Sequence, residues 1–213
     1  MFKLKKLLKE NRGFIIFIVL MSIFRSAVAD YNSVPSGSML PTIIPGDQIG
    51  IDKLAYDINV PFINHSLVHL NDPKRGEIVV FESEAADMRM VKRVIGTPGD
   101  VIELVNNQLV INGTPVNYSD NEVYSPQYSE LLPDKTHAIQ IEGYSDLTTF
   151  GPVTVPENAL LVLGDNRNNS ADSRVYGFIP RGEVIGRATR VVMSFNYDEH
   201  YKPRSDRFWK PLI

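Results

Sequence analysis

The residues MRMVKRVIGTPGD, 88–100, carry the clearest indication of the fold class. Successive side chains of a strand point to opposite faces, and residues 88–96 alternate in this way. One face carries Met90, Lys92 and Val94. The Thr-Pro-Gly-Asp at 97–100 is a turn signal, since proline presets one backbone angle and glycine tolerates a positive φ. The stretch therefore predicts a β-strand that ends in a tight turn.

The same pattern of short strands and turns continues on both sides. The chain has 213 residues with 14 Gly, 14 Pro and no Cys, a composition typical of a turn-rich globular protein. Residues 117–150 lack a clear period and predict an insertion with long loops. Strands are predicted within QIGIDKLA (48–55), EIVVFES (77–83), DVIELVNNQLVINGTPV (100–116), VTVPENALLVLGDN (153–166) and GFIPRGEVIGRATRVVMSFN (177–196).

The N-terminus bears on location. Residues 1–12 carry five Lys/Arg and one Glu, a charge of +4. The net charge of the chain is −3, so the remaining residues carry −7. This balance argues against nucleic-acid binding. An apolar segment follows, residues 13–24, and two interpretations stay open. It is the core of a cleaved signal peptide ending at Ala27-Val28-Ala29, or part of a short membrane anchor over 13–29. Both put the basic end inside and the body outside.

Two serines stand in VPSGSMLPT, residues 34–42. A serine hydroxyl is a weak nucleophile and needs a base, which is usually a histidine. The four histidines lie in stretches without a dense motif, and we interpret each as a surface or loop residue: His65, His69, His137 and His200. A Ser-His-Asp hydrolase is therefore poorly supported.

Lysine is the alternative base. It serves only when neutral, which requires burial away from water to lower its pKa from about 10.4 to roughly 7–8. Lys92 lies between Met90 and Val94 on its strand face, and the positive charges of Arg89 and Arg93 also disfavour the ammonium. The plain alternative is an exposed strand lysine.

A third polar cluster is LGDNRNNSADSRVYG, residues 163–177. An EF-hand loop needs Gly at its sixth position and Glu at its twelfth, and neither possible frame satisfies this. The cluster is therefore interpreted as a polar turn in which Asp172 and Arg174 form a pair that stabilises the loop.

Taken together and in order, these clusters resemble the bacterial type I signal peptidases over nearly the whole chain. The resemblance rests on five motifs: PSGSMLPTIIPGD (35–47), KLAYDINVPF (53–62), RGEIVVF (75–81), MVKRVIGTPGD (90–100) and GDNRNNSADSRVYGFIP (164–180). It implies a mainly β fold, an antiparallel β-sheet or partly open barrel of the type shared with autocleaving repressors. It also implies a β-rich insertion and a single N-terminal transmembrane helix.

The resemblance implies a role for each matching residue. Ser38 is the nucleophile and Lys92 the general base. The hydroxyl of Ser36 and the backbone N–H of Ser38 form the oxyanion hole. Ser170 hydrogen-bonds the lysine and helps to orient it. Asp172 and Arg174 are structural supports. No metal or cofactor is implied.

The resemblance also implies an organisation and a place in the cell. The chain would be a single-pass protein of the bacterial inner membrane, with its N-terminus in the cytoplasm and its catalytic domain outside. Its partners would be exported preproteins and the lipid bilayer. The expected division is a basic segment (1–12), a membrane anchor (13–29), a catalytic β domain (30–100 and 160–213) and a cap-like β subdomain (101–159).

Two positions depart from the family pattern: Asp57 replaces a common Gly and Asn168 a common Asp.

Three other hypotheses compete with a signal peptidase. A conjugative-transfer maturation protease would share the Ser/Lys chemistry. An autocleaving repressor needs an N-terminal DNA-binding helix-turn-helix, where this chain has a membrane-like segment. An anchored β-rich binding module would not depend on Ser38 or Lys92. The sequence gives no indication of oligomeric state.

Overall fold

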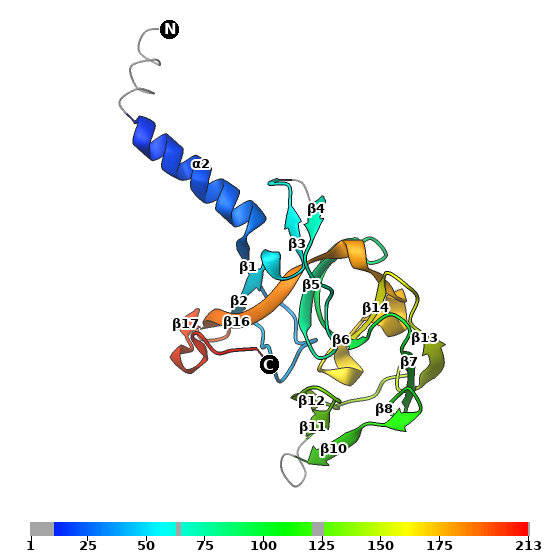
Figure 1. The fold of residues 1–213 in the computed structure, drawn as a ribbon. Helices are drawn as coiled ribbons and strands as arrows, with labels where there is room; N and C mark the ends of the chain where they lie inside the picture. The colour runs from blue at the N-terminus through cyan, green and yellow to red at the C-terminus, as the bar shows by residue number, and fades with distance from the viewer. Residues whose placement is uncertain (1–10, 63–64, 121–125, 213) are drawn as a thin grey trace.

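The structure is a computed structural model that describes residues 11–62, 65–120 and 126–212. The prediction of a mainly β, antiparallel fold is confirmed (Figure 1). The largest sheet has eight strands. They are β1 (Ala29–Ser33), β2 (Asp47–Asp52), β5 (Ile78–Ser83), β6 (Met88–Gly96), β14 (Ala159–Leu163), β15 (Ile179–Pro180), β16 (Val184–Asn196) and β17 (Lys202–Pro203).

The main sheet has the order β1-β2-β16-β5-β6-β14-β15, with β17 paired to β16. Its strands curve, so that β5, β6, β14 and β16 bend round a common interior (Figure 1). β6 pairs with β5 from Met88 to Arg93, which sets Lys92 opposite Val79. It pairs with β14 only in its second half, where Leu163 lies opposite Arg93. Apolar clusters cover both faces of β6, because Met90 and Val94 pack into one cluster and Ile95 into another.

The strands between β6 and β14 form two further sheets. A four-stranded sheet contains β7 (Val101–Val105), β8 (Gln108–Ile111), β9 (Thr114–Pro115) and β13 (Phe150–Thr154). The predicted strands around Asn106-Asn107 are confirmed, and both asparagines have the positive φ of a tight hairpin turn. A three-stranded sheet contains β10 (Asn117–Asp120), β11 (Gln127–Leu131) and β12 (Thr136–Gln140).

The second of these sheets corrects the prediction of long loops over 117–150. The alternation was hidden because polar residues occupy inward positions. Glu130 and His137 face each other across β11 and β12, and both are buried. Arg167 pairs with the Glu130 carboxylate and makes the burial of that charge possible, since a buried charge must have a partner. Burial lowers the pKa of His137, which favours its neutral ring.

The predicted strand over 48–55 is also too long. β2 ends at Asp52, whose carboxylate accepts a hydrogen bond from Leu54 N and begins a short 3-10 helix. The remaining elements are η1 (Lys53–Ala55), β3 (Asp57–Asn59), β4 (Ser66–His69), η2 (Arg167–Asn169), α3 (Ser173–Tyr176), η3 (Arg181–Glu183) and η4 (Ser205–Arg207).

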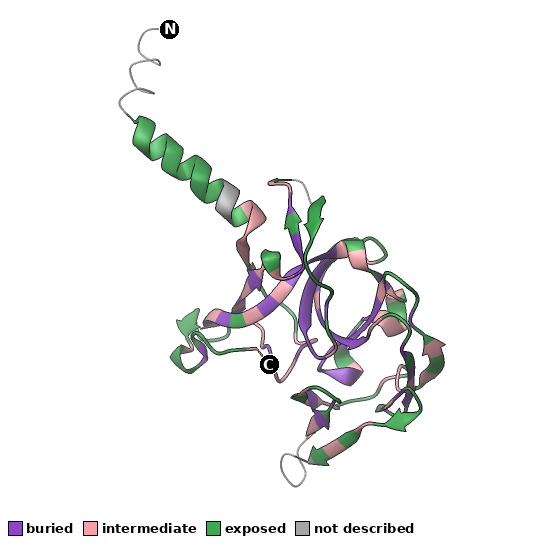
Figure 2. Cartoon of the chain, viewed as in Figure 1, coloured by how far each residue is buried: buried purple, intermediate pink, exposed green. Residues whose placement is uncertain are grey.

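Helix α2 (Arg12–Ala27) projects away from the sheets (Figure 1). Its side chains from Phe14 to Met21 are exposed although they are apolar (Figure 2). Within the part of the chain that the structure describes, no helix is both long enough and apolar enough to span a membrane. The predicted transmembrane helix over 13–29 is therefore not confirmed. Residues 1–10 of the predicted basic segment lie outside the described residues.

Candidate active site

Ser38 and Lys92 meet, although 54 positions separate them in the sequence. Lys92 Nζ lies 2.8 Å from Ser38 Oγ. Lys92 comes from the middle of β6 and is only 4% exposed. Ser38 lies on the tight turn after β1, which is held by a hydrogen bond from Leu40 N to Gly37 O. The next residue, Met39, is buried in the core and fixes the turn against the sheet.

The environment of Lys92 favours a neutral amine. Burial lowers the pKa of Lys92 to about 8, from an ordinary value of 10.5. The carboxylates of Asp172 and Asp165 oppose this shift, and the Arg174 guanidinium assists it. The sequence assigned the assisting charge to Arg89 and Arg93. That assignment is wrong, because those two arginines pair with carboxylates of their own.

A glycine brings the last polar cluster against the serine turn. β14 ends at Leu163, and Gly164 follows where the backbones approach closely. A Cβ at position 164 would lie 2.5 Å from Ser38 O and 2.2 Å from Ser170 Oγ, so other residues would force the segments apart. Asn166 joins the two segments: its backbone N donates to Ser38 O at 3.1 Å and its Nδ2 to Gly37 O at 3.0 Å.

Ser36 lies beside the nucleophile candidate. Its Oγ is 3.4 Å from Ser38 Oγ, and its side chain is exposed. A hydroxyl in this position can reach an oxygen bound to a carbonyl carbon that Ser38 attacks.

Ser170 departs from its predicted contact. Its hydroxyl donates to Asp172 Oδ2 at 2.7 Å, whereas the hydrogen bond of Lys92 is the one to Ser38. The predicted hydrogen bond between Ser170 and Lys92 is therefore wrong for this structure. The Asp172 carboxylate is buried, and its pKa is lowered, so it is ionised and a strong acceptor for the Ser170 proton.

Asp172 and Arg174 form the predicted pair. Arg174 Nε and Nη2 each lie 2.8 Å from a carboxylate oxygen of Asp172. Burial alone would raise the pKa of Asp172, but the hydrogen bonds and charge of Arg174 hold it below its ordinary value. Asp172 also accepts from Gly164 N at 2.9 Å, and Arg174 donates to the backbone oxygens of Leu147 and Arg167. The pair thus links the polar cluster to the end of β14 and to the insertion.

A groove of about 470 Å³ runs past the two residues. Residues 32–39 and 88–92 form its main walls, and Asn169, Ala171 and Tyr176 complete it. β14 pairs with β6 only from Arg93 to Gly96. The backbone of β6 before Arg93 is therefore an edge against which an extended peptide can pair.

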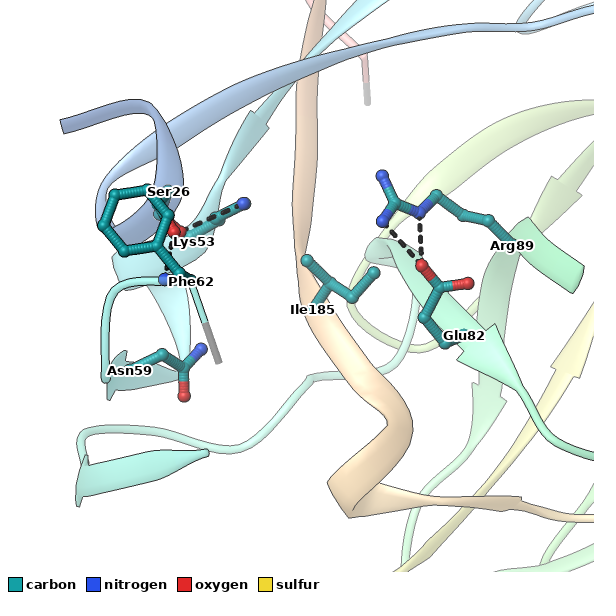
Figure 3. Close-up of a pocket in the computed structure, with 7 residues that line it drawn as sticks. All are labelled: Ser26, Lys53, Asn59, Phe62, Glu82, Arg89 and Ile185. Atoms are coloured by element: carbon teal, nitrogen blue, oxygen red, sulfur yellow. Dashed lines mark hydrogen bonds and ion pairs between the residues drawn. The ribbon is translucent and has the colours of Figure 1, made fainter. Parts of the chain in front are cut away.

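A second cavity lies between the end of α2 and the main sheet (Figure 3). In this view Ser26 and Phe62 stand on one side, Ile185 in the middle, and the ion pair of Arg89 and Glu82 on the other. Its lining includes neither Ser38 nor Lys92, so the chemistry does not lie there. Arg89 lines both this cavity and the groove, which makes the two neighbours.

Sequence reasoning missed a buried ionic network behind Lys92. Arg93 donates from Nε and Nη2 to the two oxygens of Asp165, each at 2.8 Å. Thr42, on the chain that follows the serine turn, also donates to Asp165. A signal was present, since Arg93 stands between Val91 and Ile95 on a strand face, and a charge on an apolar face requires a buried partner.

The interpretation of His137 as a surface or loop residue is wrong. His137 is buried on β12, with Nε2 3.3 Å from Glu130 Oε1 and 3.8 Å from Asp165 Oδ1. Arg167 pairs with Glu130 on the other side. His65, His69 and His200 are exposed, as predicted.

Comparisons with known proteins identify the family of the chain. The family model for signal peptidase, peptidase S26, matches residues 7–193. Signal peptidase I S of Bacillus subtilis is 34% identical, over 91% of this chain and 93% of that protein. Signal peptidase I of Leptolyngbya laminosa is 35% identical, over 80% of this chain and 72% of that protein. A crystal structure of a signal peptidase I from Enterococcus faecalis is 32% identical, covers 56% of this chain and 99% of its own, and superposes with a TM-score of 0.37.

The match to the family model covers most of the chain, and two of these relatives exceed 30% identity over the greater part of it. The chain therefore belongs to the signal peptidase family, peptidase S26, the serine peptidases that remove signal peptides from exported preproteins.

Proposed function

We propose that this chain is a membrane-bound endopeptidase that cleaves preproteins after Ala-x-Ala-like segments, with Ser38 as nucleophile and Lys92 as general base. One observation carries the proposal. The amine of a buried lysine, whose pKa is lowered to about 8, lies 2.8 Å from a serine hydroxyl. That is the distance and the protonation behaviour that an activated nucleophile requires.

The reaction uses one proton carrier throughout. Neutral Lys92 takes the proton of Ser38 Oγ as that oxygen bonds to the scissile carbonyl carbon. The resulting ammonium gives the proton to the departing nitrogen when the carbon–nitrogen bond breaks, which leaves an acyl-enzyme and a free amine. Lys92 then takes a proton from water, which attacks the ester, and returns it to Ser38 Oγ. The complete cycle of acylation and hydrolysis leaves the dyad as it began.

Negative charge develops on the carbonyl oxygen in both halves of the reaction. The donors proposed for it are Ser36 Oγ–H and the backbone N–H of Ser38. The 3.4 Å between the two serine oxygens supports this role for Ser36. A donor aimed at a developing oxyanion is worth about 3–4 kcal/mol of transition-state stabilisation.

The substrate would lie extended in the groove. Its backbone would pair with the edge of β6 at residues 88–91 and with residues 32–35 on the other wall. Alternate side chains of an extended peptide point the same way, which suits a motif with two small residues separated by one. Ser170, Asp172 and Arg174 would hold the turn that closes the groove near Lys92.

The proposed function also implies a division of the chain into domains. Residues 30–100 and 160–213 would form the catalytic domain, its coiled sheet a partly open barrel. Residues 101–159, with their two separate sheets, would form the cap-like subdomain.

Helix α2 and the basic residues before it would anchor the protein. The helix buries none of its apolar side chains from Phe14 to Met21 against the body, so water would be a costly environment for them. Five cations precede or open the helix, which favours a cytoplasmic N-terminus and an active site on the outer face of the bacterial inner membrane.

The pH dependence of cleavage tests the proposed base. Below pH 8 Lys92 is an ammonium and cannot accept a proton, so kcat/KM for an Ala-x-Ala peptide should rise with pH through a midpoint near 8. Initial rates at low substrate concentration from pH 6 to 10.5 measure this, with circular dichroism at each pH as the control for folding. A midpoint near 10, typical of an exposed lysine, would contradict the assignment.

Membrane extraction tests the anchor. After a carbonate wash the full-length chain should remain in the membrane pellet. Val19→Lys should shift it toward the supernatant, because a charge at the centre of a span costs about 2.5–3.5 kcal/mol. Val19→Leu is the matched control and should stay in the pellet. Release of a wild-type chain that begins at residue 30 would instead support the cleaved signal peptide.

A further inference from the structure

Three cavities form a series along the active-site face. The cavity of Figure 3 shares Arg89 with the groove that holds Ser38 and Lys92. The groove in turn shares Asn169 with a third cavity of about 340 Å³. Polar residues line the third cavity, and they come from η2, the polar turn before it and the chain at the end of β12: Gln140, Glu142, Tyr144, Asn166, Asn168 and Asn169.

The series has a direction. Its first cavity includes Ser26, near the end of α2, and Phe62. If α2 lies in the membrane, as proposed above, the signal-peptide half of a preprotein reaches the groove from this end. The half that follows the cleaved bond then leaves past Asn169 into the third cavity.

Asn166 lines that cavity and carries an unused acceptor. The residue is only 3% exposed, and its backbone N and its Nδ2 are both committed to the serine turn. Among the described residues nothing donates a hydrogen bond to its Oδ1. A buried acceptor without a donor is costly, and an N–H of a bound peptide would satisfy it. Since Asn166 contacts Gly37 and Ser38 directly, that N–H belongs to the first residues after the cleaved bond.

Glu142 gives the same cavity its charge. Its side chain is exposed, and one of its oxygens accepts from Gln140 Nε2 at 2.7 Å. Among the described residues that line the cavity, Glu142 is the one with a charged side chain, since the others are amides, a tyrosine and a glycine. A carboxylate at the exit attracts a basic side chain or the new N-terminal ammonium and repels an acidic residue.

We propose that this third cavity, with Asn166 and Glu142 as its determinants, receives the first two or three residues of the mature segment and disfavours acidic residues there. The inference rests on the proposed function and deepens it, since it gives the mature segment of the preprotein a binding site on this chain. Asn166 accepts a backbone N–H, and Glu142 selects by charge.

Peptide length tests whether the cavity is used. Two peptides share one Ala-x-Ala segment and have either one or four residues after the cleaved bond. The shorter should show about tenfold lower kcat/KM, because it loses the hydrogen bond to Asn166 and the contacts beyond it. Equal kcat/KM values would overturn the proposal.

Peptides of opposite charge test the role of Glu142 in selecting the substrate. Two peptides of full length carry Lys or Asp at the second and third positions after the bond. Wild type should favour the Lys peptide by about fivefold in kcat/KM at low salt, and 1 M NaCl should reduce the ratio. Glu142→Gln should bring the ratio near one, and Glu142→Lys should invert it. Glu157→Lys, the same charge change on an exposed glutamate of the turn before β14, should leave the ratio as in wild type.

Cleavage of a neutral reference peptide distinguishes failure of the proposed function from failure of the assignment of the third cavity. If wild type does not cleave it, the proposed function fails. If wild type cleaves it and Glu142→Lys retains the wild-type preference for the Lys peptide, the assignment of the cavity is overturned while the dyad stands. Wild-type cleavage of the neutral peptide with inverted preference in Glu142→Lys supports both.

Discussion

Replacing Ser38 by alanine is expected to lower kcat/KM for an Ala-x-Ala preprotein by at least about a thousandfold. The variant keeps the groove and the oxyanion donors but has no oxygen to form the acyl-enzyme. Lys92→Met should cause a loss of similar size, because Ser38 would have no acceptor for its proton within the 2.8 Å that now separates the two groups. Since the two residues act as one unit, the double variant should be no less active than either single variant.

Lys92→Met should also change the free energy of unfolding, and the direction of the change shows whether Lys92 is buried. The pKa of Lys92 is lowered to about 8 in the fold and returns to 10.5 on unfolding. Between these values the unfolded chain binds more protons, so wild-type stability from this group rises with pH. Below pH 8 the buried ammonium costs about 3 kcal/mol, which Lys92→Met removes. The variant should therefore be the more stable protein at pH 7, by an amount that shrinks as the pH approaches 10.5.

Controls separate this result from general damage. Ser119→Ala on β10 and Lys135→Met before β12 remove the same groups away from the groove and should cleave like wild type. Urea unfolding followed by circular dichroism gives the stability of each variant. Turnover near the wild-type rate in Ser38→Ala or Lys92→Met would exclude the dyad and favour another protease centre or a binding module.

Asp165→Ala is expected to destabilise the fold by about 3–5 kcal/mol, because it leaves the Arg93 guanidinium buried without its bidentate carboxylate. Burial alone would raise the pKa of Asp165, but Arg93 holds it below its ordinary value, so the carboxylate is ionised at neutral pH. Arg93→Met should cost a comparable amount. The double variant Arg93→Met with Asp165→Leu should cost less than the sum, since neither charge then remains buried alone.

Arg89→Met is the matched control on the same strand. Its partner Glu82 is about as close, at 2.6 Å, but both side chains are substantially exposed. Exposed pairs contribute about 0–1 kcal/mol, so the free energy of unfolding should change little. A loss in Asp165→Ala no larger than in Arg89→Met would show that the buried pair does not stabilise the fold.

Much of the site could be predicted because its local signals are short in range. The alternation around Lys92 predicted β6 with its observed bounds. The predicted turn at 97–100 is also present, and a hydrogen bond from Thr97 N to Asp100 Oδ2 holds it. The asparagine turn after β7 depends only on residues that tolerate a positive φ. These features involve neighbours in the chain, so the sequence contains their cause.

The contacts that buried polar residues make with distant segments could not be predicted from the sequence. The structure, not the sequence, shows that Arg93 turns to Asp165, that Ser170 turns to Asp172, and that His137 is buried beside Glu130. Arg93 and Ser170 each donate to the carboxylate that folding brings near, and His137 is buried next to one. These contacts depend on which distant segments meet.

The same division holds for the chain as a whole. The order of its residues sufficed for a mainly β fold, for Lys92 on an apolar strand face and for Ser38 on a turn, because strand period and turn chemistry are local. The 2.8 Å contact between those two residues, the lowered pKa of the lysine and the acceptor at Asn166 arise only when β6, β14 and the serine turn pack together. Burial and distance are properties of that packing, and they turn an ordinary lysine and an ordinary serine into a reactive pair.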